Sequence, residues 1–88
     1  MRGLEQLAQW NYHARHRGTR MLEYAADFAR AQGPEVSMTK CVYPAVGRAW
    51  NTSAQAAEAN MRYAAKQAGD KRPVGEIVHD LMRRCDPD

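Results

Sequence analysis

The chain has 88 residues, of which 44% are hydrophobic and 26% charged, and its formal net charge is +3. This composition is typical of a globular protein with a single domain, residues 1–88, and it excludes a chain that is disordered throughout. So short a chain buries only about 60–65% of its unfolded surface, which disfavours the large water-excluding cavity of most enzymes. We expect no enzyme activity, no catalytic residues and no cofactor.

Membrane, disulfide and metal features are weak in this sequence. It has no apolar run of about 18 residues and no secretory hydrophobic segment, so we expect a cytoplasmic protein without membrane contact. Cys41 and Cys85 both fall at apolar helical positions, which predicts reduced, buried thiols rather than a disulfide. His13 and His16 have no carboxylate or cysteine nearby in sequence to complete a four-ligand site, so we expect no metal.

Residues typical of turns divide the chain into helical segments: Gly18, Gly33-Pro34, Asn51-Thr52 and Gly69-Asp70. Apolar spacing predicts a short helix over residues 4–10, followed by a basic stretch over residues 13–20. A central helix is predicted over residues 19–32, with its charged side chains on one stripe. Gly33 and Pro34 end that helix in the usual way.

The middle of the chain predicts short helices separated by tight turns. Ser37 is typical of an N-cap for a helix over residues 37–43, and Pro44 suits the first position of the next one, over 44–50. Asn51 tolerates the left-handed conformation that ends a helix, and Thr52 with Gln55 forms a capping-box pattern for a helix over 53–68. We therefore predict a helix-turn-helix over about residues 44–68.

A final helix is predicted after Pro73, with arginines 83 and 84 in its last turn, where cations favour the helix dipole. No segment alternates apolar and polar residues with period two, so no strands are expected. The predicted fold is an all-α compact bundle of about six helices.

The helix over residues 53–68 separates into two faces. Its predicted inner face is apolar and consists of Ala54, Ala57, Met61, Ala64, Ala65 and Ala68. Its predicted outer face carries Gln55, Ala59, Arg62, Tyr63 and Lys66, with Glu58 and Asn60 on the flanks. Arginine can bind guanine, and glutamine or asparagine can bind adenine, while alanines let a helix enter the major groove. The same pattern also suits an ordinary solvated helix.

The run from Ser37 to Ala54 is specific enough to indicate a family. Its elements Thr39-Lys40-Cys41-Val42-Tyr43-Pro44 and Asn51-Thr52-Ser53-Ala54, together with residues 18–25, resemble the C-terminal DNA-binding effector domain of the sporulation initiation response regulator, stage 0 sporulation protein A. The similarity extends with gaps over most of the chain. It implies a bacterial transcriptional regulator with six helices, in which the fourth and fifth form the helix-turn-helix and bind a short DNA box, often in tandem.

The sequence also departs from that family. The recognition helix of the family is rich in arginine, whereas the matching positions here include Ala56 and Ala59, and only Glu58 and Arg62 are kept. The family contacts sigma subunits of RNA polymerase through a longer segment, of which only residues 69–73 correspond here. A receiver domain does not fit into 88 residues. Contact with RNA polymerase and dimerisation on DNA are therefore open alternatives.

The sequence thus predicts a sequence-specific regulator whose partner is double-stranded DNA. The residues predicted to contact bases are Gln55, Glu58, Asn60 and Arg62. The residues predicted to contact phosphates are Arg15, Arg17, Arg20, Arg48, Thr52, Ser53 and Lys66. The alternative is an all-α protein-interaction module that has the same scaffold and has lost specific DNA binding, which the missing arginines and the small net charge favour.

Overall fold

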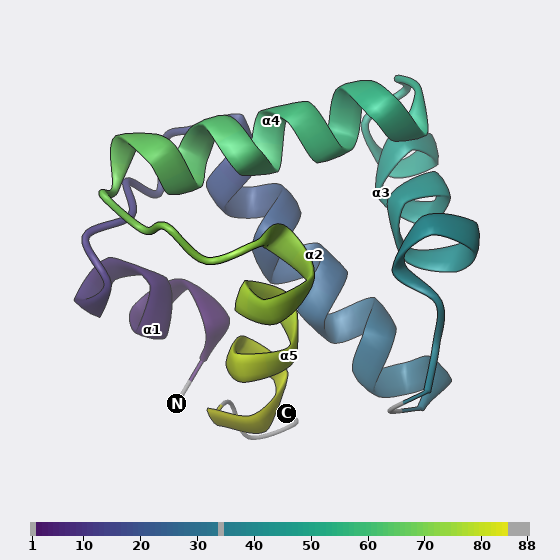
Figure 1. Cartoon of the computed structure of the whole chain (residues 1–88), viewed down its shortest axis with the longest axis horizontal. Coiled ribbons are helices and arrows are strands. Elements are labelled where there is room, and N and C mark those ends of the chain that lie inside the picture. The colour runs from purple at the N-terminus through teal and green to yellow at the C-terminus, as the bar shows by residue number, and fades with distance from the viewer. Residues whose placement is uncertain (1, 34, 85–88) are drawn as a thin grey trace.

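The computed structural model describes residues 2–33 and 35–84, which contain helices and no strand. The helices are α1 (Gly3–Gln9), α2 (Arg17–Gln32), α3 (Tyr43–Ala49), α4 (Ala54–Gln67) and α5 (Val74–Arg84), and a π-helical turn, η1 (Met38–Val42), precedes α3 (Figure 1). The predicted all-α class is confirmed. The predicted count of about six helices is not met, because the expected helix over 37–43 is this π-helical turn. Val42 and Tyr43 both have right-handed helical angles, so η1 continues into α3 without a break.

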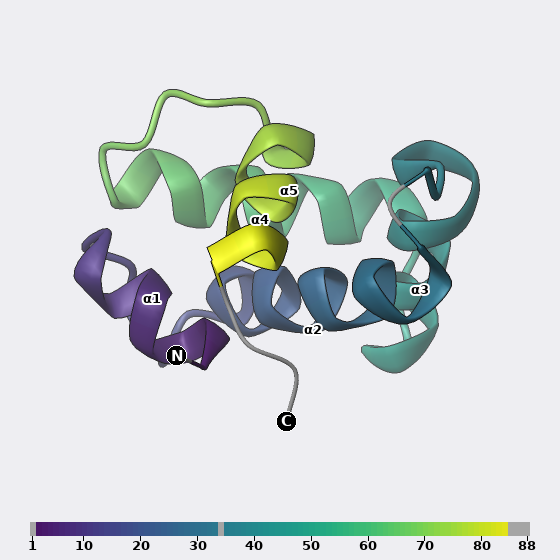
Figure 2. The ribbon, with the colours of Figure 1, turned by 90° about the horizontal axis from the view of Figure 1, so that it is seen from below.

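Helix α4 lies along one edge of the molecule, with α2 crossing beneath it and α3 standing at its N-terminal end (Figure 1). Seen from below, α5 lies in front of α2 and α4, with α1 on one side and α3 on the other (Figure 2). The helices enclose one core, and its largest fully buried side chains are Leu7, Met21, Leu22, Met61, Ile77, Leu81, Val42, Val46 and Val78. This arrangement leaves one face of α4 without a covering element.

The crossing of α2 and α4 depends on a glycine. Gly18 is buried in the first turn of α2, and an added Cβ there would collide with the backbone carbonyl of Asn60 and lie 2.8 Å from the Cβ of Ala64. The sequence predicts a turn at Gly18 and a helix from residue 19, and this is wrong. The glycine is needed for close helix packing, and α2 begins at Arg17.

Three of the four predicted boundary features in the middle of the chain are confirmed, and the first is Pro44, which lies in the first turn of α3. The Ser37 hydroxyl accepts a hydrogen bond from the Lys40 backbone N–H at 3.1 Å, and Asn51 has a φ of 55°, in the left-handed region. The N-cap of α4 is Ser53, whose Oγ accepts from the Ala56 N–H at 3.0 Å, so the predicted capping role of Thr52 is wrong. Ser53 has the extended conformation that an N-cap requires.

The prediction for Cys41 is also wrong, because the structure places this residue on the surface. The next residue, Val42, is the one that η1 turns fully into the core, so Cys41 faces outwards. Cys85, like Pro34, lies outside the described residues. No helix within residues 2–33 and 35–84 combines the length and the apolar character that crossing a membrane would require.

Candidate nucleic-acid interface

The turn between α3 and α4 is short and closely packed. Trp50 caps the C-terminus of α3, and the Thr52 backbone N–H donates to the Gly47 carbonyl at 2.8 Å. Gly47 is buried, and a Cβ at this position would lie 2.7 Å from the Thr52 carbonyl oxygen. The absence of a side chain at Gly47 therefore lets the chain return directly over α3, which fixes the direction in which α4 leaves the turn.

The faces of α4 are arranged as the sequence predicts. Four residues of the predicted inner face are buried, namely Ala57, Met61, Ala64 and Ala65, and the other two, Ala54 and Ala68, are half-buried. Its outer face carries five exposed residues: Gln55, Ala59, Arg62, Tyr63 and Lys66. Tyr63 is the most exposed large hydrophobic residue described, at 59%. A helix of 14 residues is about 21 Å long, and this one presents small and hydrogen-bonding side chains along that length.

The four predicted base-contacting residues occupy different environments. Gln55 and Arg62 are exposed, and Arg62 pairs with Glu58 one turn earlier, at 2.9 Å between Nη1 and Oε1. Glu58 is half-buried beside Tyr43, and burial together with this carboxylate raises the pKa of the Tyr43 hydroxyl. Asn60 is half-buried, and its side-chain amide donates to the Ala56 carbonyl at 2.8 Å. Gln55 and Arg62 thus lie towards solvent, whereas Glu58 and Asn60 lie on the flanks of α4.

Most of the predicted phosphate-contacting residues lie on the surface. The exposed members are Arg15, Arg17, Arg20, Arg48, Ser53 and Lys66, and Thr52 is half-buried. The hydroxyl of Ser53 is already used as the helix cap. Arg20 lies in a hollow shared with the carboxylates of Glu23 and Asp27. The cations are therefore spread over several helices rather than gathered at one point along α4.

The basic stretch, residues 13–20, runs into the first turn of α2 and lies beside the middle of α4. Gly18 packs against the Asn60 carbonyl, as described above, and the rings of His16 and Tyr63 are 6.5 Å apart between centroids. Arg15 and Arg17 flank His16 in sequence and are exposed. Residues about 45 positions apart in sequence thus lie side by side. Figure 1 shows the start of α2 passing behind α4.

Comparison with known proteins found no matching family model, no matching curated protein and no matching solved structure. The family resemblance stays a prediction from residues 18–25 and 37–54. The proposed binding surface is therefore argued from the positions of the residues in the structure.

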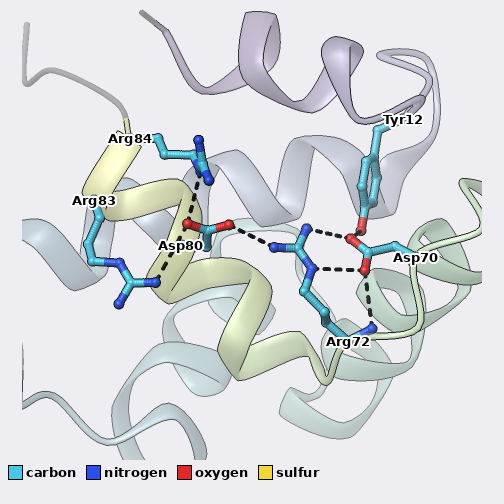
Figure 3. Close-up of polar contacts among 6 residues, drawn as sticks. All are labelled: Tyr12, Asp70, Arg72, Asp80, Arg83 and Arg84. Atoms are coloured by element: carbon cyan, nitrogen blue, oxygen red, sulfur yellow. Dashed lines mark hydrogen bonds and ion pairs between the residues drawn. The ribbon is translucent and has the colours of Figure 1, made fainter.

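The opposite flank of α4 holds a polar cluster that the sequence analysis did not find (Figure 3). The guanidinium of Arg72 donates to both carboxylate oxygens of Asp70, at 2.9 and 2.7 Å, and to Asp80 at 2.8 Å. The Tyr12 hydroxyl donates to Asp70 at 2.8 Å, and Arg84 donates to Asp80 at 3.0 Å. The cluster links the segment after α1 to the loop between α4 and α5 and to α5 itself.

Four ionisable groups of this cluster, Tyr12, Asp70, Arg72 and Asp80, have pKa values shifted by burial and by their partners. The hydrogen bonds from Arg72 hold the pKa of Asp70 below its ordinary value of 3.8. Burial opposes ionisation of Asp80, but the hydrogen bonds and charges of Arg84 and Arg72 outweigh it and lower the pKa of Asp80. Burial and the bond to Asp70 raise the pKa of Tyr12. The cluster is therefore charged and internally satisfied at neutral pH, as expected of a structural clamp.

The guanidinium of Arg72 also lies over the ring of Trp10, with its central carbon 4.5 Å from the ring centroid. This cation–π contact adds α1 to the elements that the cluster joins. His13 and His16 have ring centroids 5.3 Å apart. In the part of the chain that the structure describes, no three His, Cys, Asp or Glu side chains are close enough to hold a metal ion.

Proposed function

We propose that this chain binds double-stranded DNA with α3 and α4 as a helix-turn-helix pair and α4 as the reading helix. The observation that carries the proposal is the uncovered outer face of α4, with Gln55 and Arg62 exposed on it. The major groove is about 12 Å wide and admits one α-helix. Ala59, at the middle of this face, has a small side chain, so the backbone of α4 can approach the bases there.

Charge on both sides of α4 supports the same proposal. Arg15 and Arg17 are the sequence neighbours of His16, whose ring lies 6.5 Å from that of Tyr63, and Lys66 and Lys71 line the hollow on the other flank of α4. Cations on both sides of a helix in the major groove face the two phosphate backbones that border the groove. The only carboxylate of α4, Glu58, is already paired with Arg62.

Within this proposal the polar residues have separate roles. Arg62 and Gln55 address base edges, because they are the polar outer-face side chains best suited to guanine and adenine. Glu58 orients the guanidinium of Arg62 through their 2.9 Å ion pair. The cations Arg15, Arg17, Arg48 and Lys66 contact phosphates and set the affinity. We further propose that the chain acts as a transcriptional regulator, which rests on the family resemblance of residues 37–54.

The proposal is tested first by titrating a labelled random-sequence duplex with the protein at two salt concentrations. Binding should fall steeply with salt, and Lys66→Ala should reduce the slope of log K against log salt by about one. Arg83→Ala is the matched control, because Arg83 is an exposed cation on the last turn of α5, away from α4 (Figure 1). Its slope should equal that of the wild type.

Selection from a randomised duplex library then tests sequence preference. For the selected site, Arg62→Ala should lose about 1–3 kcal/mol of discrimination against a mismatched site. Equal losses on selected and random duplexes would contradict a base-reading role for Arg62. If no salt-dependent binding is seen, the DNA proposal is rejected in favour of the protein-interaction module, for which Tyr63, at 59% exposure, is the best anchor.

A further inference from the structure

A hollow lies on the flank of α4 opposite the basic stretch, between that helix and the loop leading into α5. Its volume is about 650 Å³, and residues of its wall include Tyr43, Arg62, Ala65, Lys66, Lys71 and Val74. Small-molecule sites are typically clefts of about 300–1,000 Å³ with mostly apolar walls and a few polar groups. The hollow has this size and this kind of lining.

The charges around the hollow are unbalanced in favour of cations. Glu58 is paired with Arg62, and the carboxylate of Asp70 is occupied by Arg72 and Tyr12. Among the described residues, Lys66 and Lys71 have no carboxylate within 4.0 Å of their amino groups. Two unbalanced ammonium groups therefore stand beside an apolar wall.

The loop that forms one side of the hollow is held by hydrogen bonds within the chain. The Asp70 backbone N–H donates to the Ala65 carbonyl at 2.9 Å, and the Arg72 backbone N–H donates to the Asp70 carboxylate at 3.1 Å. The contacts of Figure 3 then tie Asp70 to Tyr12 and, through Arg72, to Asp80. Because the wall is held in place beforehand, a ligand would not have to order it on binding.

We propose that this hollow binds a small amphipathic anion, an aromatic ring system that carries one negative group. The ring system lies against Tyr43, Ala65 and Val74, and the negative group lies between the ammonium groups of Lys66 and Lys71. The site goes beyond DNA binding and does not require it. Where both occur, they exclude each other in part, because Arg62 and Lys66 belong to both surfaces.

The test uses 1-anilinonaphthalene-8-sulfonate and its uncharged analogue N-phenyl-1-naphthylamine, with fluorescence titrations in the absence of DNA. The sulfonate should bind saturably at one site. Lys71→Glu should raise its Kd roughly threefold to tenfold, the range for replacing an exposed attraction by a repulsion. Lys40→Glu is the matched control, because it makes the same charge change at an exposed lysine that does not line this hollow, and it should leave the Kd unchanged.

The neutral analogue separates charge recognition from apolar contact. Lys71→Glu should leave its Kd unchanged, because the analogue has no negative group. The sulfonate should also raise the melting temperature of the wild type, because a ligand that binds only the native state stabilises it. Three results would each overturn the site. They are equal Kd values of the sulfonate for Lys71→Glu and Lys40→Glu, a Kd of the neutral analogue that Lys71→Glu raises as much as that of the sulfonate, and a melting temperature that the sulfonate lowers. Since no DNA is present, these results are independent of the DNA-binding proposal.

Discussion

Replacing Gly18 by alanine tests the close packing on which the α4 surface depends. The added Cβ would collide with the Asn60 carbonyl, which belongs to the α4 backbone and cannot rotate away, and would lie 2.8 Å from the Ala64 Cβ. Overpacking of this kind costs up to about 3 kcal/mol, and the higher helix propensity of alanine offsets up to about 1 kcal/mol. We expect Gly18→Ala to lower the free energy of unfolding by about 2 kcal/mol.

Gly75→Ala is the matched control for this prediction. Gly75 is also the second residue of its helix, but a Cβ there would meet only the Met38 side chain, at an ordinary 3.6 Å. This variant should be as stable as the wild type or more stable by up to about 1 kcal/mol. The two variants should therefore differ by about 3 kcal/mol in urea unfolding followed by circular dichroism. If they agree within about 0.5 kcal/mol, α2 and α4 are not packed as closely as described.

Three further predictions concern the helix cap and the polar cluster. Ser53→Ala should lower the free energy of unfolding by about 1 kcal/mol, because it removes the N-cap of α4. Thr52→Ala should lower it clearly less, and equal effects of the two substitutions in urea titrations would contradict the assignment of Ser53 as the cap. Asp70→Asn should be less stable than the wild type at pH 7, and this difference should shrink as the pH falls below 3.8, since the lowered pKa of Asp70 gives stability that protonation removes. A difference that is constant between pH 7 and pH 3 would exclude the clamp as its cause. Tyr12→Phe should lower the free energy of unfolding by about 1 kcal/mol in the wild type and by less in Asp70→Asn, because each change removes the same hydrogen bond. If the two losses are additive in this double-mutant cycle, the hydrogen bond contributes nothing to stability.

The two proposed binding surfaces share Arg62 and Lys66 and otherwise use different sides of α4. DNA would use the outer face and the basic stretch beside Tyr63, whereas the amphipathic anion would use the hollow beside Lys71. Arg62 and Lys66 line that hollow and are exposed on the outer face, so on these proposals neutralising their charge at one surface would weaken binding at the other. If both proposals hold, binding of the small anion would compete with binding of DNA.

Local sequence patterns predicted the helices and the two faces of α4. Short-range rules suffice for these features, because a helix with alanines and Met61 at helical spacing buries that side in almost any packing. The same holds for the Ser37 cap and the left-handed Asn51, which depend only on neighbouring residues. Thr52 and Ser53 are both good caps, so the pattern placed the cap of α4 one residue too early.

The sequence by itself determined that the chain is helical, where most of its turns lie and which side of α4 faces the core, because these features follow from contacts within a few residues. Only the tertiary structure decided that Gly18 is a packing contact, that Cys41 is exposed and that Tyr12 meets Asp70, 58 positions later. It also placed the basic stretch beside Tyr63 and formed the hollow beside Lys71. These features depend on how whole helices cross, which is set by the shape of the shared core and not by any local pattern.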